Sequence, residues 1–255
     1  SLRVLWLGGL AILFAIALLY PVLATQARFL DRFAPEKTPL TLDGMDYMQY
    51  AVHGEHELWF PLRGDYEMIR WLQDNVEGTP VVAEAHLYPS EYHWGGRISI
   101  YTGLPTVLGW RFHQLQQHSL DPLNLLVQTR ENNVAAFYEI PGEDGIRTAL
   151  SLADHYDIQY IVVGALERAF YGDIATDPET LRQTAGHSEG LAKFETMVEQ
   201  DLLAVVFRAP RCLEYGTPVE ACSPDQVYYD TIYRFVPDTQ ASPPSAAAPA
   251  RSSCS

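Results

Sequence analysis

Between Glu84 and Gln117 the sequence concentrates residue types that recognise sugars and phosphorylated sugars. The candidate side chains of this block are Glu84, Tyr92, Trp94, Arg97, Trp110 and His113. Aromatic rings cover the apolar faces of a sugar, and an Arg side chain forms paired hydrogen bonds with a phosphate or a carboxylate. We therefore treat the block as a candidate substrate-binding site, in which Arg97 pairs with Glu84 or Glu167. From the residues alone we favour the alternative, a well-packed loop whose Arg–carboxylate pair and Trp side chains belong to the core, because buried Arg–carboxylate pairs are common structural elements.

Other chemistries have less support. The sequence contains no glycine-rich phosphate-binding loop, no Gly-x-Ser-x-Gly motif and no Cys-x-x-Cys pair. His113 and His118 are five positions apart, so one helix face cannot present both to a zinc ion. An irregular group of possible ligands remains, formed by His86, His93, His113, His118, Glu84 and Glu91. Loop and core histidines explain this group better than a metal site, so we predict no bound metal and assign no catalytic residue.

Two cysteines indicate on which side of the membrane the domain lies. Cys212 and Cys222 flank the polar loop LEYGTPVEA, whose Pro and Gly suit a short disulfide bridge. A disulfide indicates an oxidising, extracytoplasmic environment. Two unpaired cysteines in a surface loop are the alternative. We predict the disulfide, with Cys254 left as a free thiol.

The N-terminal segment predicts a transmembrane helix. Residues 4–27 contain no charged side chain, and Arg3 and Arg28 flank them. About 20 apolar residues span the hydrocarbon core of a bilayer as a helix. A signal peptide is a rival interpretation, but its apolar region usually runs for only about 7–15 residues. A buried helix of a soluble protein is the other. The basic residues at both ends leave the orientation undecided.

After this helix, alternating helix and strand patterns predict a compact mixed α/β domain. Apolar runs predict strands at residues 81–85, 160–164 and 202–207, a β-rich run predicts one at 98–102, and a last strand is expected near 231–236. Apolar spacing predicts helices at 65–76 (N-capped by Asp65), 121–138 (in two pieces), 144–155 and 191–199. We divide the chain into a helix (1–27), a connector (28–64), the α/β domain (65–236) and a disordered Pro-, Ser- and Ala-rich tail (237–255).

The charge balance argues against one class of partner. The chain has 17 Lys and Arg residues against 32 Asp and Glu residues, a formal net charge of −15. Nucleic-acid-binding proteins present a basic surface to phosphate groups. We therefore expect no nucleic acid among the partners, and we expect the membrane lipid bilayer as one of them.

Several segments, taken in order, resemble one family. They are TLDGMDYM (41–48), DYEMIRWLQDNVEGTPVVAEA (65–85), Tyr92 with WGGRISIYTGLPTVLGW (94–110), HQLQQ (113–117), YIVVGALERAFY (160–171) and AKF (192–194). This series is similar to the C-terminal part of the YYY membrane-protein family, also described as domain of unknown function 2298. Members are polytopic and similar to the GT-C glycosyltransferases. The resemblance covers roughly residues 40–207. The family pattern has an acidic residue and Trp-Arg after the His, whereas here His113 is followed by Gln-Leu-Gln-Gln.

The resemblance implies that the helix at 1–27 is the last span of a multi-pass protein of the cell membrane and that the domain is extracytoplasmic. It implies a membrane glycosyltransferase with a polyprenyl-phosphate sugar donor and a catalytic carboxylate in an earlier loop, so this chain alone would be inactive. The chain would then bind the lipid-linked sugar or the acceptor, without a cofactor of its own. Trp94 or Trp110 would border a membrane-proximal groove, since aromatic rings are frequent at the interface. The alternative is a membrane-anchored structural or interaction subunit without catalysis.

Overall fold

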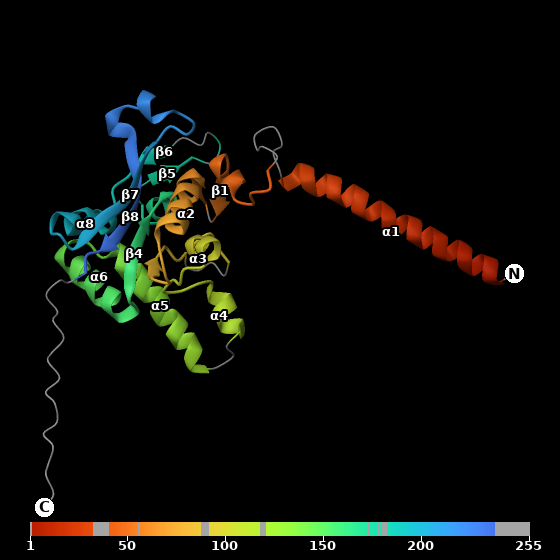
Figure 1. Ribbon diagram of the computed structural model, residues 1–255, viewed down its shortest axis with the longest axis horizontal. Coiled ribbons are helices and arrows are strands. Elements are labelled where there is room, and N and C mark those ends of the chain that lie inside the picture. The colour runs from red at the N-terminus through yellow and green to blue at the C-terminus, as the bar shows by residue number, and fades with distance from the viewer. Residues whose placement is uncertain are drawn as a thin grey trace, which may run out of the picture.

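The computed structural model describes residues 2–32, 41–55, 57–87, 92–117, 121–172, 174–177, 179 and 183–237. Its first element, α1 (Leu2–Arg32), is a continuous helix that projects from the rest of the chain (Figure 1). The segment Leu2–Phe29 is long and apolar enough to cross a membrane, and its side chains are not buried against the domain. The chain therefore has the N-terminal helix of membrane-spanning length that the sequence predicts.

The domain is built on a four-stranded mixed sheet. Its strands, in spatial order, are β3 (Val81–Ala83), β4 (Ile158–Val163), β8 (Val227–Phe235) and β7 (Leu203–Cys212). β3 and β4 run parallel, whereas β8 is antiparallel to both of its neighbours. A parallel pair needs a crossover connection, and residues 84–157 supply one that contains helices. The predicted mixed α/β fold is confirmed, with a parallel pair among its strands.

Helices cover both faces of the sheet because its inner strand β4 is apolar on both sides. Tyr160 and Val162 pack into one core together with α2 (Arg63–Asn75), α3 (Arg97–Thr102) and α7 (Ala165–Phe170). Ile161 and Val163 pack into a second core together with α5 (Asp121–Glu139), α6 (Gly142–Tyr156) and α8 (Glu189–Glu199). Alternate residues of a strand face opposite sides, so a continuous apolar run is what a strand between two helical layers requires (Figure 1).

Smaller elements surround this three-layer core. A 3₁₀ turn, η1 (Asp46–Gln49), and an antiparallel hairpin of β1 (Val52–Glu55) and β2 (Leu58–Pro61) precede α2. α4 (Arg111–Gln117) precedes α5, and a second hairpin pairs β5 (Ile174–Thr176) with β6 (Gln183–Ala185). The turns η2 (Val219–Ala221) and η3 (Pro224–Gln226) lie between β7 and β8. Met48 and Phe60 are fully buried, so part of the segment that we expected to be a connector packs into the core of the domain.

The strand predicted at residues 98–102 is wrong, because these residues belong to α3. Gly96 and Gly103 bracket this helix with φ angles of 116° and 76°, a region that residues with a side chain rarely adopt. The Glu84 carboxylate accepts hydrogen bonds from the backbone N–H groups of Ile98 and Ser99 in the first turn. These tertiary bonds, together with the burial of Ile98, outweigh the β preference of the Ile and Tyr residues.

Other elements agree with the sequence in type and differ at their ends. α2 begins at Arg63, so Asp65 lies in its first turn rather than at its N-cap. α5 is one helix rather than two pieces. The tail predicted to be disordered lies, apart from Pro237, outside the described residues.

Candidate functional site

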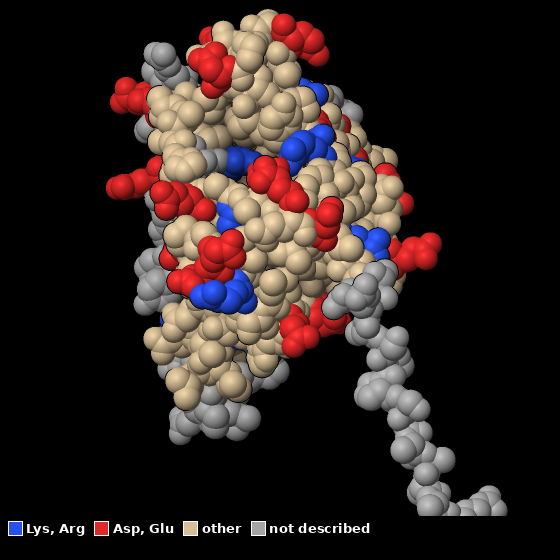
Figure 2. Space-filling model, turned by 90° about the vertical axis from the view of Figure 1, so that its left-hand side faces the viewer, with Lys and Arg blue, Asp and Glu red and all other residues tan. Residues whose placement is uncertain are grey.

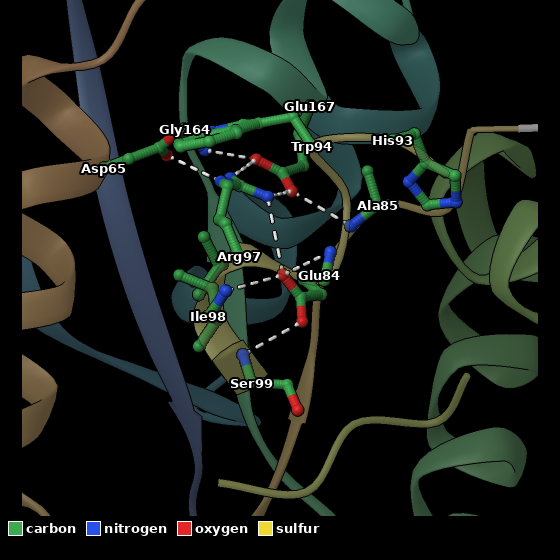
Figure 3. Close-up of polar contacts among 12 residues, drawn as sticks. Asp65, Glu84, Ala85, His93, Trp94, Arg97, Ile98, Ser99, Gly164 and Glu167 are labelled. Atoms are coloured by element: carbon green, nitrogen blue, oxygen red, sulfur yellow. Dashed lines mark hydrogen bonds and ion pairs between the residues drawn. The ribbon is translucent and has the colours of Figure 1, made fainter. Parts of the chain in front are cut away.

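Arg97, at the start of α3, lies among three carboxylates (Figure 3). Its Nε lies 2.8 Å from Oδ1 of Asp65, and its Nη2 lies 2.8 Å from Oε2 of Glu167. Nη1 donates to Oε1 of Glu167 over 3.2 Å and lies 3.6 Å from Oε2 of Glu84. The structure thus brings Arg97 together with both carboxylates considered for it from the sequence, and adds Asp65. Sequence reasoning missed Asp65 because it assigned this residue to the cap of α2.

The fold positions these carboxylates where two parallel strands end. Glu84 directly follows β3 and accepts hydrogen bonds of 3.0, 3.1 and 3.3 Å from three backbone N–H groups at the start of α3. Glu167, in the first turn of α7 after β4, accepts from the backbone N–H groups of Ala85 and Gly164, each over 2.9 Å. The network therefore ties α3 to the ends of β3 and β4 and, through Asp65, to α2 (Figure 3).

One guanidinium cannot neutralise three buried carboxylates, and the three acids differ accordingly. Each of the four side chains belongs to a residue at most 3% exposed. Burial raises the pKa of Glu84 to about 7 and also raises the pKa of Asp65, and Arg97 offsets these effects only in part. Burial opposes the ionisation of Glu167 too, but its contacts with Arg97 and its two backbone hydrogen bonds together outweigh burial and lower its pKa. Glu167 is therefore the one of the three acids whose ionised form the cluster favours, and the cluster is closed to solvent.

The two Trp side chains of the candidate site use their indole N–H groups inside the protein. Nε1 of Trp94 donates to Oδ2 of Asp65 over 2.7 Å, so Trp94 belongs to the Arg97 cluster. Nε1 of Trp110 donates to the backbone oxygen of His93 over 2.8 Å. Both residues are half-buried. Neither indole N–H is therefore available to a ligand in this conformation.

Tyr92, Trp110, Phe112 and His113 form a separate aromatic cluster. The ring centroid of Tyr92 lies 5.2 Å from that of Trp110, 5.7 Å from that of Phe112 and 6.4 Å from that of His113. Tyr92, Phe112 and His113 are exposed. The residues predicted to form one site thus divide into a sealed ionic cluster and a surface aromatic cluster.

The histidines considered as metal ligands divide as well. His86 and His93 pack edge to face, with ring centroids 4.6 Å apart. Burial, reinforced by His93, lowers the pKa of His86 to about 4, so its imidazole is neutral at physiological pH. Over the part of the chain that the structure describes, no three His, Cys, Asp or Glu side chains are grouped as ligands. Glu91 and His118 lie outside that part.

A pocket of about 370 Å³ opens elsewhere, beside the loop that follows β7. Its lining includes Gln49, Arg63, Gln183, Arg211, Tyr215 and Tyr228. A disulfide joins Cys212 and Cys222, with their Cα atoms 5.8 Å apart, and closes the loop that forms one wall. Sequence reasoning missed the pocket because its walls are far apart along the chain. The cysteine-bounded loop was the one local feature that marked its place.

Two polar side chains in this lining differ in what they offer a ligand. Arg211 donates from Nε to Oδ2 of Asp230 over 2.7 Å and from Nη2 to Oε2 of Glu67 over 2.6 Å, which fixes its guanidinium. Burial raises the pKa of Asp230 to about 6 although Arg211 opposes it. Gln183 is only 6% exposed, and its Oε1 has no hydrogen-bond partner among the described residues. That oxygen is therefore a buried acceptor whose hydrogen-bonding capacity is unused in the wall of the pocket.

Fold and contacts together define a mixed α/β domain that carries an N-terminal helix long and apolar enough to span a membrane. No family model, no curated protein and no solved structure matches the chain.

Proposed function

We propose that this chain is the extracytoplasmic C-terminal part of a multi-pass membrane protein similar to the GT-C glycosyltransferases, and that it binds the sugar of a lipid-linked donor or the acceptor. The pocket beside the Cys212–Cys222 loop is the observation that supports binding. Its volume of about 370 Å³ falls in the range of small-molecule sites, about 300–1,000 Å³. Gln49 and Ala51, from the first described segment after α1, contribute to its lining.

The lining suits a hydroxyl-rich ligand better than a phosphate group. Arg211 already binds two carboxylates, so it is not a free clamp for phosphate. Tyr215 is 40% exposed and offers an aromatic ring of the kind that covers an apolar sugar face. Side chains that donate to or accept from hydroxyl groups are also present, namely Gln49, Gln183, Glu214 and Glu220. The sugar, rather than the lipid phosphate, is therefore the part of the donor that we assign to this pocket.

In this proposal, sugar transfer itself takes place in another part of the full protein. A general base must reach the acceptor hydroxyl within about 3 Å, directly or through one water. Glu84 and Glu167 are sealed in the Arg97 cluster and do not meet this requirement. The resemblance assigns the catalytic carboxylate to an earlier loop, and the polyprenyl-phosphate sugar is then a substrate of the whole protein. The disulfide between Cys212 and Cys222 supports an extracytoplasmic location.

Saturation-transfer NMR on the full chain in detergent micelles tests the pocket. The probes are methyl α-mannoside, methyl β-glucoside and methyl β-galactoside. We expect at least one of them to receive saturation from the wild-type chain and to lose it in Tyr215→Ala. The matched control is Tyr229→Ala, because Tyr229 has nearly the same exposure, 42% against 40%, and does not line the pocket. Equal saturation in the two variants, or none in the wild type, would refute a sugar site here.

A second candidate is a membrane-anchored structural or interaction subunit. The closed state of the Arg97 cluster favours it, because the most distinctive block of the sequence then serves the fold. The coding sequence upstream of Ser1 separates the two candidates. Eight or more further hydrophobic spans favour the glycosyltransferase-like protein, whereas an initiator Met immediately before Ser1 favours the subunit.

A further inference from the structure

α4 and the N-terminal half of α5 form a helical hairpin at one end of the domain (Figure 1). Arg111 of α4 pairs with Glu131 of α5 over 3.1 Å at the root of this hairpin. No residue of α4 is buried. Large apolar side chains stay exposed on both helices: Phe112 is 43%, Leu125 69% and Leu126 57% exposed. We call Phe112, Leu125 and Leu126, with Tyr92 beside Phe112, the hairpin surface.

The charge of this region differs from that of the rest of the chain. Residues 92–130 contain only one acidic residue, Asp121, although the chain as a whole has 32, and of their three Arg residues Arg97 is sealed in the ionic cluster and Arg111 pairs with Glu131. By contrast, the face drawn in Figure 2, which α6 and α8 cover, carries many acidic side chains with basic ones among them. Anionic lipid headgroups attract Arg and Lys and repel carboxylates. Exposed aromatic and apolar side chains with few carboxylates among them suit a surface that lies in a membrane interface.

Chain length keeps the domain beside any bilayer that α1 spans. Residues 33–40 join α1 to the first described residue of the domain, and eight residues reach at most about 30 Å when fully extended. A folded domain of about 200 residues is roughly 40 Å across. One of its faces must therefore lie at or near the membrane surface. β1, α3 and α4 lie along the side of the domain that is nearest to α1 (Figure 1).

We infer that the α4–α5 hairpin rests in the headgroup region of the bilayer that α1 spans, with Phe112, Leu125 and Leu126 in contact with lipid. Tyr92 and Trp110 then lie at the depth where aromatic rings are favoured. The domain itself leaves the apolar area of the hairpin surface exposed to water. Contact with lipid removes that area from water, which is favourable. This inference goes beyond the proposed function, since it requires no ligand in the pocket. Two points, α1 and the hairpin, would then fix the orientation of the domain on the membrane.

Fluorescence of an attached nitrobenzoxadiazole label tests this contact. The full chain carries Cys254→Ser, so that a new cysteine is the labelled one while Cys212 and Cys222 remain joined. The label is placed at Leu126→Cys and, as a matched control, at Gln200→Cys, an exposed position at the end of α8 on the far side of the domain (Figure 1). Both proteins are placed in nanodiscs of phosphatidylcholine and phosphatidylglycerol, with and without nitroxide-labelled lipid.

We expect the label at position 126 to show a blue-shifted emission and to lose emission when nitroxide lipid is present, and the label at position 200 to do neither. A blue shift without loss of emission would mean that protein, such as a second copy of this chain, covers the hairpin, and would overturn the inference. Equal behaviour of the two labels would overturn it as well. With the label at Phe112→Cys, the Leu125→Asp and Leu126→Asp changes should abolish the quenching, because they place carboxylates in the interface.

Discussion

Replacing Arg97 with Leu removes the cation that the carboxylates of Asp65, Glu84 and Glu167 share. All four residues are at most 3% exposed, so water cannot replace the lost charge. Removing one partner of a buried ion pair costs about 3–5 kcal/mol. The total stability of a domain is only about 5–15 kcal/mol. We therefore expect Arg97→Leu to lower the free energy of unfolding by about 3–5 kcal/mol at pH 8.

This cost should shrink as the pH falls. Burial raises the pKa of Glu167, whereas Arg97 and the backbone N–H groups of Ala85 and Gly164 lower it, so loss of Arg97 in the variant shifts that pKa upward. A carboxyl whose pKa is raised on folding stabilises the protein below its unfolded pKa, and that contribution is lost as the pH rises through the folded pKa. Glu84 and Asp65, whose pKa values burial already raises, act in the same direction. The variant should therefore recover stability relative to the wild type between pH 8 and pH 5.

The free energy of unfolding at pH 8 and at pH 5 is measured by urea titration of the full chain in one type of micelle, followed by Trp fluorescence. The control is Arg147→Leu, since Arg147 pairs with Asp144 while both side chains are more than 70% exposed. Such a pair contributes less than about 1 kcal/mol. The loss of stability in Arg97→Lys should lie between the losses in Arg97→Leu and Arg147→Leu, because Lys keeps the charge and loses the forked contacts. The charge argument is refuted if Arg97→Leu costs no more than Arg147→Leu at pH 8, or costs the same at both pH values.

Two further predictions concern other buried and bridged groups. Lys193 is 2% exposed, and burial lowers its pKa from 10.5 to about 7, so the unfolded chain binds more protons between these values and stability should rise with pH there. Urea titrations at several pH values should show a smaller rise of stability with pH in Lys193→Met than in the wild type. An equally steep rise in the variant would contradict the prediction for Lys193. Changing both Cys212 and Cys222 to Ser should lower the free energy of unfolding by about 3 kcal/mol, the loop-closure value for a bridge of this length. Alkylation of the untreated chain should modify Cys254 alone, and modification of all three cysteines would show that the bridge is absent.

Much of the fold could be predicted because its inner strands are encoded locally. The run Ile158–Val163 is apolar at every position except Gln159, which is typical of a strand covered on both faces. α6 and α8 follow from their apolar spacing. The wrong strand prediction at residues 98–102 has a physical cause. α3 depends on hydrogen bonds that its backbone N–H groups donate to Glu84, which lies just after β3, and no local pattern contains that information.

The sequence allowed us to predict that Arg97 pairs with a carboxylate. It did not allow us to predict that this pair is closed to solvent. Arg97 and two acids were identified from residue type alone, but burial decides whether such a cluster binds a ligand or holds the fold together, and burial is a property of the whole domain. Asp65 shows the same limit. An Asp near a helix start predicts an N-cap, whereas in the structure its carboxylate accepts from Trp94 and contacts Arg97. The pocket combines residues from the two ends of the domain's sequence, so local patterns do not reveal it.

The order in which the strands are synthesised has a consequence for how this protein is made. β8 lies between β4 and β7 in the sheet although it is the last element of the described chain. Until the ribosome has released residues 227–235, β4 has an open edge whose N–H and C=O groups are free to pair with another chain. Domain completion therefore waits until β8 has left the ribosome, and shorter nascent chains expose an unpaired strand edge during that time. A nonsense mutation before β8 would remove the strand that joins β4 to β7, so the sheet could not form. We expect the truncated product to be bound by chaperones and degraded by proteases.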